Sequence, residues 1–158
     1  MRRQFKDSLY KHMIKNESIY LLTADLGFGM FDRIKKNIPK RFINVGASEQ
    51  AMMGVAVGMA QEGKIPFVYS ITPFLLYRPF ETIRNYINHE KANVKMIGSG
   101  RNIDYAHDGF SHWAEEDEQV MRLFPNVQSV WPINKLQVSE LVEEMINTSG
   151  PYYVNLAR

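Results

Sequence analysis

The stretch FINVGASEQAMMGVAVGMAQEGKIPFVYSI, residues 42–71, has the pattern of a strand, a helix and a second strand. The runs FINV and PFVYSI are short and rich in β-branched and aromatic residues, which indicates strands. Between them, AMMGVAVGMA is a longer run of small residues and methionines, which indicates a helix. Such a unit favours parallel strands, because the helix carries the chain back to the starting edge of the sheet.

The same alternation continues on both sides of this unit. Further strands are predicted at SIYLLTA, VKMIGS, VQSVW and YYVNLA, and helices are predicted to begin near Phe74, Ala114 and Lys135. An amphipathic helix is expected over residues 5–14. Strands such as YLLTA are continuously apolar, which fits burial on both sides. The sequence therefore predicts an α/β fold, a doubly wound sheet of about six parallel strands with helices on both faces, as a single domain over residues 1–158.

The composition excludes several classes of protein. The absence of cysteine removes disulfides, thiolate metal sites and cysteine nucleophiles, and it is compatible with the cytoplasm, where we expect the protein. The longest apolar run has ten residues, about half of a membrane span, and the start MRRQFKDSLYKHM lacks the apolar core of an export signal. Lysines and arginines are scattered and the net charge is only +2. We therefore expect neither a membrane nor a nucleic acid as partner.

Ligands of open α/β sheets bind beyond the carboxyl ends of the strands. In this chain the segments at that edge are residues 25–30, 46–50, 71–78 and 99–112, each of which follows a predicted strand. Glu49 is in the second of them, where it opens a helix directly after Ser48. One interpretation is that Ser48 caps the helix and Glu49 complements its dipole, worth up to about 1 kcal/mol. The other is that the Glu49 carboxylate has a chemical function.

Short blocks of sequence occur along the whole chain in an order that resembles one enzyme family. The chain is similar to the pyrimidine-binding domain of the transketolase and deoxyxylulose-phosphate synthase family of thiamine-diphosphate enzymes. The blocks are Thr23-Ala24-Asp25-Leu26, Gly46 to Glu49, Gly58 to Ala60, Tyr69-Ser70, Phe74-Leu75, Arg78 to Glu81, Asp108 to His112, Met121-Arg122, Pro125-Asn126 and Gly150-Pro151. One such block would be weak evidence, but a series of blocks in the family's order is not expected by chance.

The resemblance implies a role in cofactor binding for five residues. Glu49 would donate a hydrogen bond to the pyrimidine nitrogen of thiamine diphosphate, which favours the imino form that takes the proton from the thiazolium carbon. Leu26, which follows Asp25, would be the apolar wedge that keeps the cofactor bent, although it could equally be ordinary core. Phe74 would pack on the pyrimidine face, with Tyr77 as a second aromatic candidate.

The resemblance also implies substrate contacts. Asp108 and His112 match the family's residues that bind sugar hydroxyls and move protons, and histidine suits proton transfer near neutral pH. A single loop histidine is more often structural. Arg158 matches a phosphate-binding arginine, although as the final residue it could instead be frayed and idle. Arg78 is three residues before Glu81, and we expect these two to form an ion pair along one helix.

Three positions depart from the family pattern. Gly100 stands where transketolases have another histidine, Gly29 where they often have a phosphate-contacting serine, and Trp113 where glutamine is usual. These departures put the ordinary pentose-phosphate reaction in doubt and leave the cofactor residues intact. The alternative to a pentose-phosphate substrate is a modified sugar or another ketol donor.

The family's Gly-Asp-Gly stretch, which holds magnesium and the diphosphate, does not occur here, and the chain ends where longer relatives continue into a third domain. We therefore expect a partner subunit that carries the diphosphate-binding domain and the magnesium, in a two-plus-two heterotetramer that shares thiamine diphosphate. The expected function is that of the C-terminal-type subunit of a split transketolase-like enzyme, transferring two-carbon ketol groups between sugar or sugar-phosphate substrates. The alternatives are a decarboxylase or synthase subunit, a non-catalytic or regulatory module, and a flavodoxin-like binding protein.

Overall fold

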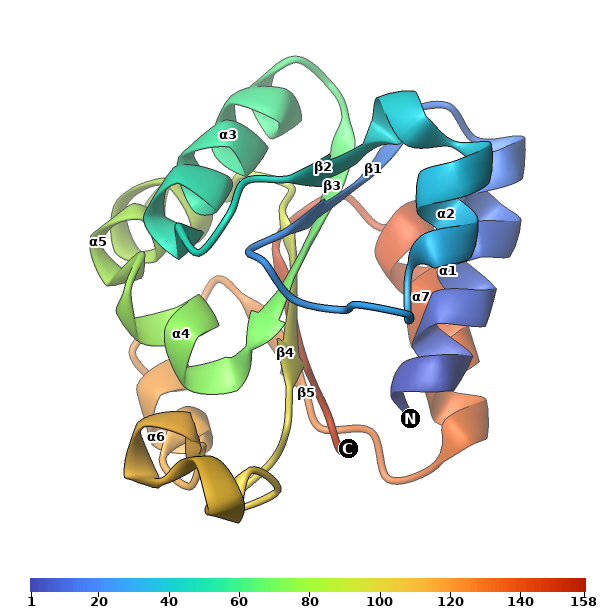
Figure 1. The fold of residues 1–158 in the computed structure, drawn as a ribbon. Coiled ribbons are helices and arrows are strands. Elements are labelled where there is room, and N and C mark those ends of the chain that lie inside the picture. Colours follow the sequence, from blue (N-terminus) through green and yellow to red (C-terminus); the bar gives the residue numbers. More distant parts are fainter.

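The computed structural model describes residues 1–158 as one six-stranded, all-parallel sheet between two layers of helices (Figure 1). The strand order is β2-β1-β3-β4-β6-β5. The strands are β1 (Ile19–Thr23), β2 (Phe42–Asn44), β3 (Ile65–Ile71), β4 (Lys95–Ser99), β5 (Gln128–Val130) and β6 (Tyr152–Leu156). The order reverses direction along the chain, as in a doubly wound sheet, so the predicted fold class is confirmed.

Seven α-helices connect or flank these strands. They are α1 (Arg2–Lys15), α2 (Asp32–Asn37), α3 (Glu49–Gln61), α4 (Thr72–Tyr77), α5 (Phe80–Thr82), α6 (Asp117–Met121) and α7 (Lys135–Asn147). A π-helix, Ile83–His89, follows α5, and neither it nor α2 was expected from the sequence. The helix predicted near Ala114 begins later, at Asp117. No helix combines the length and the apolar character needed to cross a membrane.

The sheet has an apolar core on each face. In Figure 1, α1 and α7 cover one face, and α3, α4 and α5 cover the other. Alternate residues of β3 serve the two cores: Phe67 and Tyr69 pack with Phe5 of α1, whereas Val68 packs with Met52 of α3. Full burial of one such side chain stabilises the fold by about 1.5–3 kcal/mol. The continuously apolar strands are therefore explained by burial from both sides.

A lysine is buried at the opposite end of the sheet from the predicted ligand edge. Lys95 begins β4 and is 0% exposed. Its Nζ donates hydrogen bonds to the carbonyl oxygens of Thr148 at 3.0 Å and Gly150 at 2.6 Å, just after α7. Removal from water lowers the pKa of the Lys95 amine to about 8. The amine therefore closes the turn between α7 and β6 at a cost in desolvation.

We expect Lys95→Met to change how stability depends on pH. Because the folded pKa is about 8 and the ordinary value is 10.5, the unfolded chain holds a proton that the folded chain has released between these values. The wild type should therefore gain stability as pH rises through this window, and the variant should lack that gain. Guanidinium unfolding at several pH values measures the difference.

The control for this experiment is Lys11→Met, at an exposed position of α1. Its stability should run parallel to that of the wild type from pH 7 to pH 10. A wild type and a Lys95→Met variant that differ by the same free energy at every pH would contradict the assignment.

Candidate cofactor and substrate site

Glu49 is the first residue of α3, and its side chain is 2% exposed. The hydroxyl of Ser70, on β3, donates to Glu49 Oε1 at 2.9 Å, and Arg78 donates from Nη1 to Oε2 at 2.6 Å. Ser48 precedes the helix but makes no side-chain capping bond. The carboxylate is therefore held by the neighbouring strand and by the residue after α4, in addition to lying at the positive end of the α3 dipole.

The predicted ion pair between Arg78 and Glu81 is wrong, because Arg78 pairs with Glu49 instead. The reason is local: α4 ends at Tyr77, and Pro79 separates it from α5, so residues 78 and 81 are not on one continuous helix. The guanidinium of Arg78 also lies over the Phe74 ring, with Cζ 3.9 Å from the ring centre. Arg78 thus contacts two of the residues expected to bind the cofactor.

Phe74 connects this pair to the loop that follows β4. It is half-buried on α4, and its ring packs in a T-shaped arrangement with the ring of His112, with the ring centres 4.8 Å apart and the planes at 69°. Phe74 therefore contacts both the guanidinium of Arg78 and the imidazole of His112. The fold brings Glu49, Phe74, Arg78 and His112 together from three separate segments at the carboxyl ends of the strands.

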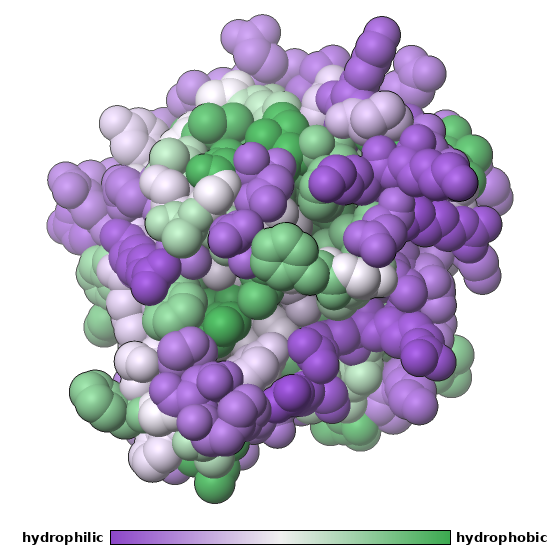
Figure 2. Space-filling model, in the orientation of Figure 1, coloured by the Kyte–Doolittle hydropathy of each residue, from purple (hydrophilic) through white to green (hydrophobic).

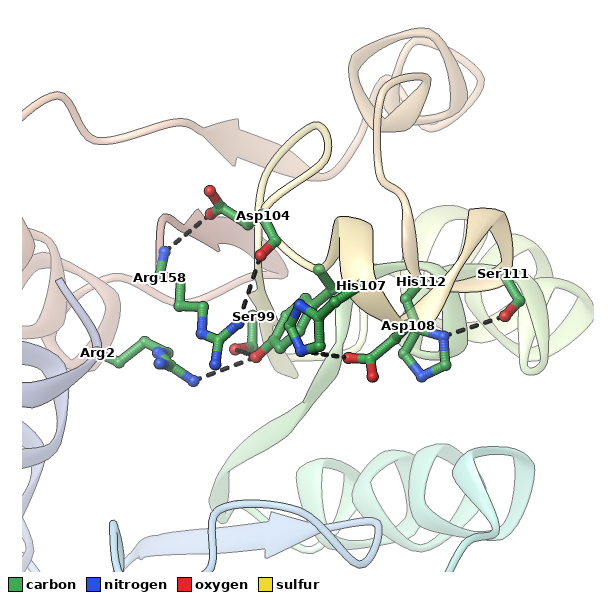
Figure 3. Close-up of polar contacts among 9 residues, drawn as sticks. Arg2, Ser99, Asp104, His107, Asp108, Ser111, His112 and Arg158 are labelled. Carbon is green, nitrogen blue, oxygen red and sulfur yellow. Dashed lines mark hydrogen bonds and ion pairs between the residues drawn. The ribbon is translucent and has the colours of Figure 1, made fainter.

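Asp108 and His112, the two residues expected to contact a sugar substrate, share no hydrogen bond or ion pair. Figure 3 shows both on the loop after β4, each with another polar neighbour. The Asp108 carboxylate lies 3.3 Å from Nε2 of His107, and Nδ1 of His112 is 3.0 Å from the Ser111 hydroxyl. Asp108 is exposed and His112 is half-buried, so both remain accessible from the edge of the sheet.

A second feature of this edge is a cationic pocket of about 590 Å³. Arg158 is one of its lining residues, where its backbone N–H donates to Asp104 at 2.9 Å and its guanidinium lies 5.0 Å from the Tyr105 ring centre. No acidic side chain lines the pocket. The cations that line it are Arg2, Arg3, Lys6, Lys135 and Arg158.

Four of these five cations were missed by sequence reasoning, and a signal for them existed. Arg2, Arg3 and Lys6 are in the first turns of α1, and Lys135 is the first residue of α7. Cations are unfavourable at a helix N-terminus, because they repel the positive end of the dipole. Together with the helix dipoles, they give this pocket a positive electrostatic potential.

The comparison with known protein families decides the assignment. A family model described as "Transketolase, pyrimidine binding domain" matches residues 1–158, the whole chain. The chain belongs to the transketolase pyrimidine-binding domain family. The resemblance read from the sequence blocks is thereby confirmed, and the doubly wound sheet is the fold of this family's solved members.

Similar proteins include subunits of transketolases. A 6-deoxy-6-sulfo-D-fructose transketolase subunit of Clostridium sp. is 33% identical over 100% of this chain and 49% of its own length. An apulose-4-phosphate transketolase subunit of Phocaeicola vulgatus is 28% identical over 99% of this chain and 51% of its own. A solved structure described as a split gene transketolase, inactive beta4 tetramer, is 36% identical, with a TM-score of 0.88 over 99% of this chain and 50% of that one. The chain thus spans about half the length of these relatives.

The loops of this transketolase pyrimidine-binding domain are joined by a residue that the sequence reading overlooked. Asn44 ends β2, and its side-chain oxygen accepts from the backbone N–H groups of Asp25 at 2.9 Å and Gly46 at 3.0 Å. Both residues have positive φ, 49° and 76°, which Asp tolerates better than most residues and Gly adopts freely. An asparagine two residues before a glycine is a recognised turn signal. Asn44 thereby holds together the two loops that lead to Leu26 and to Glu49.

Leu26 and Tyr77, the other two apolar or aromatic candidates, take no part in the hydrogen bonds of Glu49. Leu26 is half-buried, packs against the core on the α1 face of the sheet and lines a hollow of about 50 Å³ together with Phe28 and Phe31. Tyr77 is 38% exposed at the end of α4. Burial, followed by the nearby Glu116, raises the pKa of its hydroxyl. Tyr77 is therefore close to Glu116, the residue before α6.

The structure gives a physical reason for one departure from the transketolase pattern. Gly100 has φ 91°, and a side chain there would press into the ring of Tyr105. The Tyr105 hydroxyl is 3.0 Å from Ser99 Oγ and accepts from Arg2 Nη1 at 3.1 Å. Tyr105 therefore fills the space beside Gly100 and connects β4 to the start of α1 by hydrogen bonds. Gly29, another departure, has open space and lines the cationic pocket.

We expect Asn44→Ala to lower the free energy of unfolding by about 1 kcal/mol, because two backbone N–H groups lose their shared acceptor. Chemical denaturation measures this loss. Asn147→Ala, at an exposed position with no side-chain hydrogen bond at the end of α7, is the matched control and should change stability little. Equal effects of the two substitutions would contradict the role given to Asn44.

Proposed function

We propose that this chain is the pyrimidine-binding subunit of a split, transketolase-like enzyme that transfers two-carbon ketol groups with thiamine diphosphate. The observation that carries the proposal is the Glu49 carboxylate, 2% exposed at the carboxyl ends of the strands and linked through Arg78 to Phe74, which in turn contacts His112. When bound, thiamine diphosphate supplies a thiazolium carbon that becomes a nucleophile after losing a proton. The proposed site residues of this chain bind and orient the cofactor, and hold the protons that this chemistry requires.

The side chains around Glu49 fit the aminopyrimidine half of the cofactor. A planar nitrogen heterocycle needs a proton donor at one ring nitrogen and an apolar surface for its face. We assign the first role to Glu49, oriented by Ser70, and the second to Phe74. Leu26 and Asp25, on the loop after β1, form the opposite wall in this proposal, and Tyr77 supports α4 from the side.

The substrate would extend from Phe74 towards the cationic pocket. We assign His112 to proton transfer and Asp108 to binding of sugar hydroxyls, because both are accessible on the loop that borders Phe74. Arg158 and the four other cations would bind an anionic end of the substrate. A phosphate ester suits such a set, and so does a sulfonate, which the name of the Clostridium relative mentions.

The cofactor's diphosphate and magnesium would be held by a second polypeptide, in a two-plus-two heterotetramer. The relatives named as transketolase subunits support this proposal. The surface beside Glu49 also supports it, because Ala51, Gly54 and Val55 of α3 are exposed. Figure 2 shows hydrophobic side chains at the surface over α3. An exposed face of small apolar residues next to the site is suitable for close contact with another chain.

The subunit proposal predicts that thiamine diphosphate binds tightly only when both chains are present. The purified chain is mixed with the diphosphate-binding chain encoded beside it, and calorimetry in magnesium buffer measures cofactor binding to each chain alone and to the mixture. Tight binding by this chain alone would contradict the shared site. A mixture that binds the cofactor but transfers no ketol group would favour the regulatory-module alternative.

Glu49→Gln should lower turnover of the mixture by about a hundredfold or more, because the proton donor is replaced by an amide of the same shape. Assembly, measured by analytical ultracentrifugation, should be unchanged. The matched control is Glu62→Gln, an exposed glutamate just after the other end of α3, which should retain normal rates. Near-normal turnover by Glu49→Gln would refute the assignment of the acid.

A further inference from the structure

We propose that Arg78 occupies the position that the aminopyrimidine ring of the cofactor would take, and that it must be displaced before the cofactor can bind. This residue therefore sets the affinity of the site for thiamine diphosphate. The inference rests on the proposed function, because it takes Glu49 and Phe74 as the residues that bind the aminopyrimidine. Arg78 contacts both of them in the structure, and its side chain thereby connects the two.

The first reason is steric. The Arg78 guanidinium carbon is 3.9 Å from the centre of the Phe74 ring, which is the separation of two groups in van der Waals contact. A guanidinium and a pyrimidine are both flat, so they cannot cover the same face of one ring at once. His112 also packs against Phe74, with 4.8 Å between the ring centres. A heterocycle that stacks on this face of Phe74 therefore has to take the place of Arg78.

The second reason is the hydrogen bonding of Glu49. Its Oε1 accepts from Ser70 at 2.9 Å, and its Oε2 accepts from Arg78 at 2.6 Å, so both oxygens are engaged as acceptors. A protonated Glu49 that donates to a pyrimidine nitrogen needs one oxygen free of a cationic donor, since a guanidinium can only donate. Arg78 and a pyrimidine nitrogen thus compete for Oε2 by charge as well as by space.

The third reason is that Arg78 is able to leave. Its side chain is 46% exposed, whereas that of Glu49 is 2% exposed, so the arginine can reach water and the carboxylate cannot. Arg78 lies at the break between α4 and α5, directly before Pro79. Its two contacts are an ion pair, whose arginine end is accessible to solvent, and a cation–π interaction. Arg78 therefore satisfies the buried carboxylate reversibly.

The test compares thiamine-diphosphate affinity in the assembled two-chain complex with magnesium, by calorimetry. We expect Arg78→Ala to bind the cofactor about tenfold more tightly than the wild type, because the competing ion pair and cation–π contact are gone. Arg78→Lys should lie between them, since lysine keeps the charge but not the flat surface. Unchanged or weaker binding by Arg78→Ala would overturn the proposal.

The matched control is Arg84→Ala, at an arginine of the following π-helix whose side chain donates to the neighbouring Asn85. Its affinity should equal that of the wild type. The second measurement uses the isolated chain with the free hydroxymethyl aminopyrimidine half of thiamine as probe, observed by saturation-transfer NMR. The variants should show the same order, so the result does not depend on assembly or turnover.

Glu49→Gln, made alone and combined with Arg78→Ala, separates this inference from the proposed function. If Glu49→Gln leaves binding of both ligands unchanged in both backgrounds, the assignment of the pyrimidine site is wrong. If Glu49→Gln weakens binding while Arg78→Ala does not strengthen it, the site is right and the competition is wrong. Circular dichroism verifies that each variant is folded.

Discussion

The buried carboxylate of Glu49 is the constraint on which this edge of the molecule depends. A carboxylate that is 2% exposed is costly unless hydrogen bonds replace its water. The structure supplies them from β3, through Ser70, and from the residue after α4, through Arg78. The same contacts fix α3, β3 and α4 relative to one another. The group proposed for the chemistry is therefore also the point where three elements are joined.

The rest of the edge divides into two regions of different character. Around Phe74 the surface is aromatic and carries single charged or titratable groups, which suits a flat heterocycle. Around Arg158 it is strongly cationic, because two helix N-termini and five basic side chains converge there. Tyr105 lies between the regions, bonded to Ser99 and Arg2, and near His112. The arrangement is consistent with the proposed substrate, which would have one reactive end and one anionic end.

Much of the fold could be predicted because its signals are local. Each of the six strands was anticipated from a short apolar run, and Glu49 from its place between a strand and an apolar helix. The six-residue α2 was missed because it is short, and the π-helix was missed because its buried Ile83 and Ile87 have the spacing of an ordinary α-helix. Lys95 was read as part of an apolar strand, and its burial depends on carbonyl groups more than fifty residues away. The pairing of Arg78 was predicted wrongly, because the prediction used helical spacing alone and overlooked the helix break that Pro79 signals.

By itself the sequence determined the α/β architecture, the family and the edge of the sheet at which the proposed site residues gather. These follow from apolar periodicity and from ordered motifs, which are properties of neighbouring residues. Only the tertiary structure decided which of those residues meet. Arg78 reaches Glu49 across 29 positions, and Arg2 reaches Tyr105 across 103. Such contacts are set by how strands and helices pack in three dimensions, and residue spacing along the chain carries no record of them.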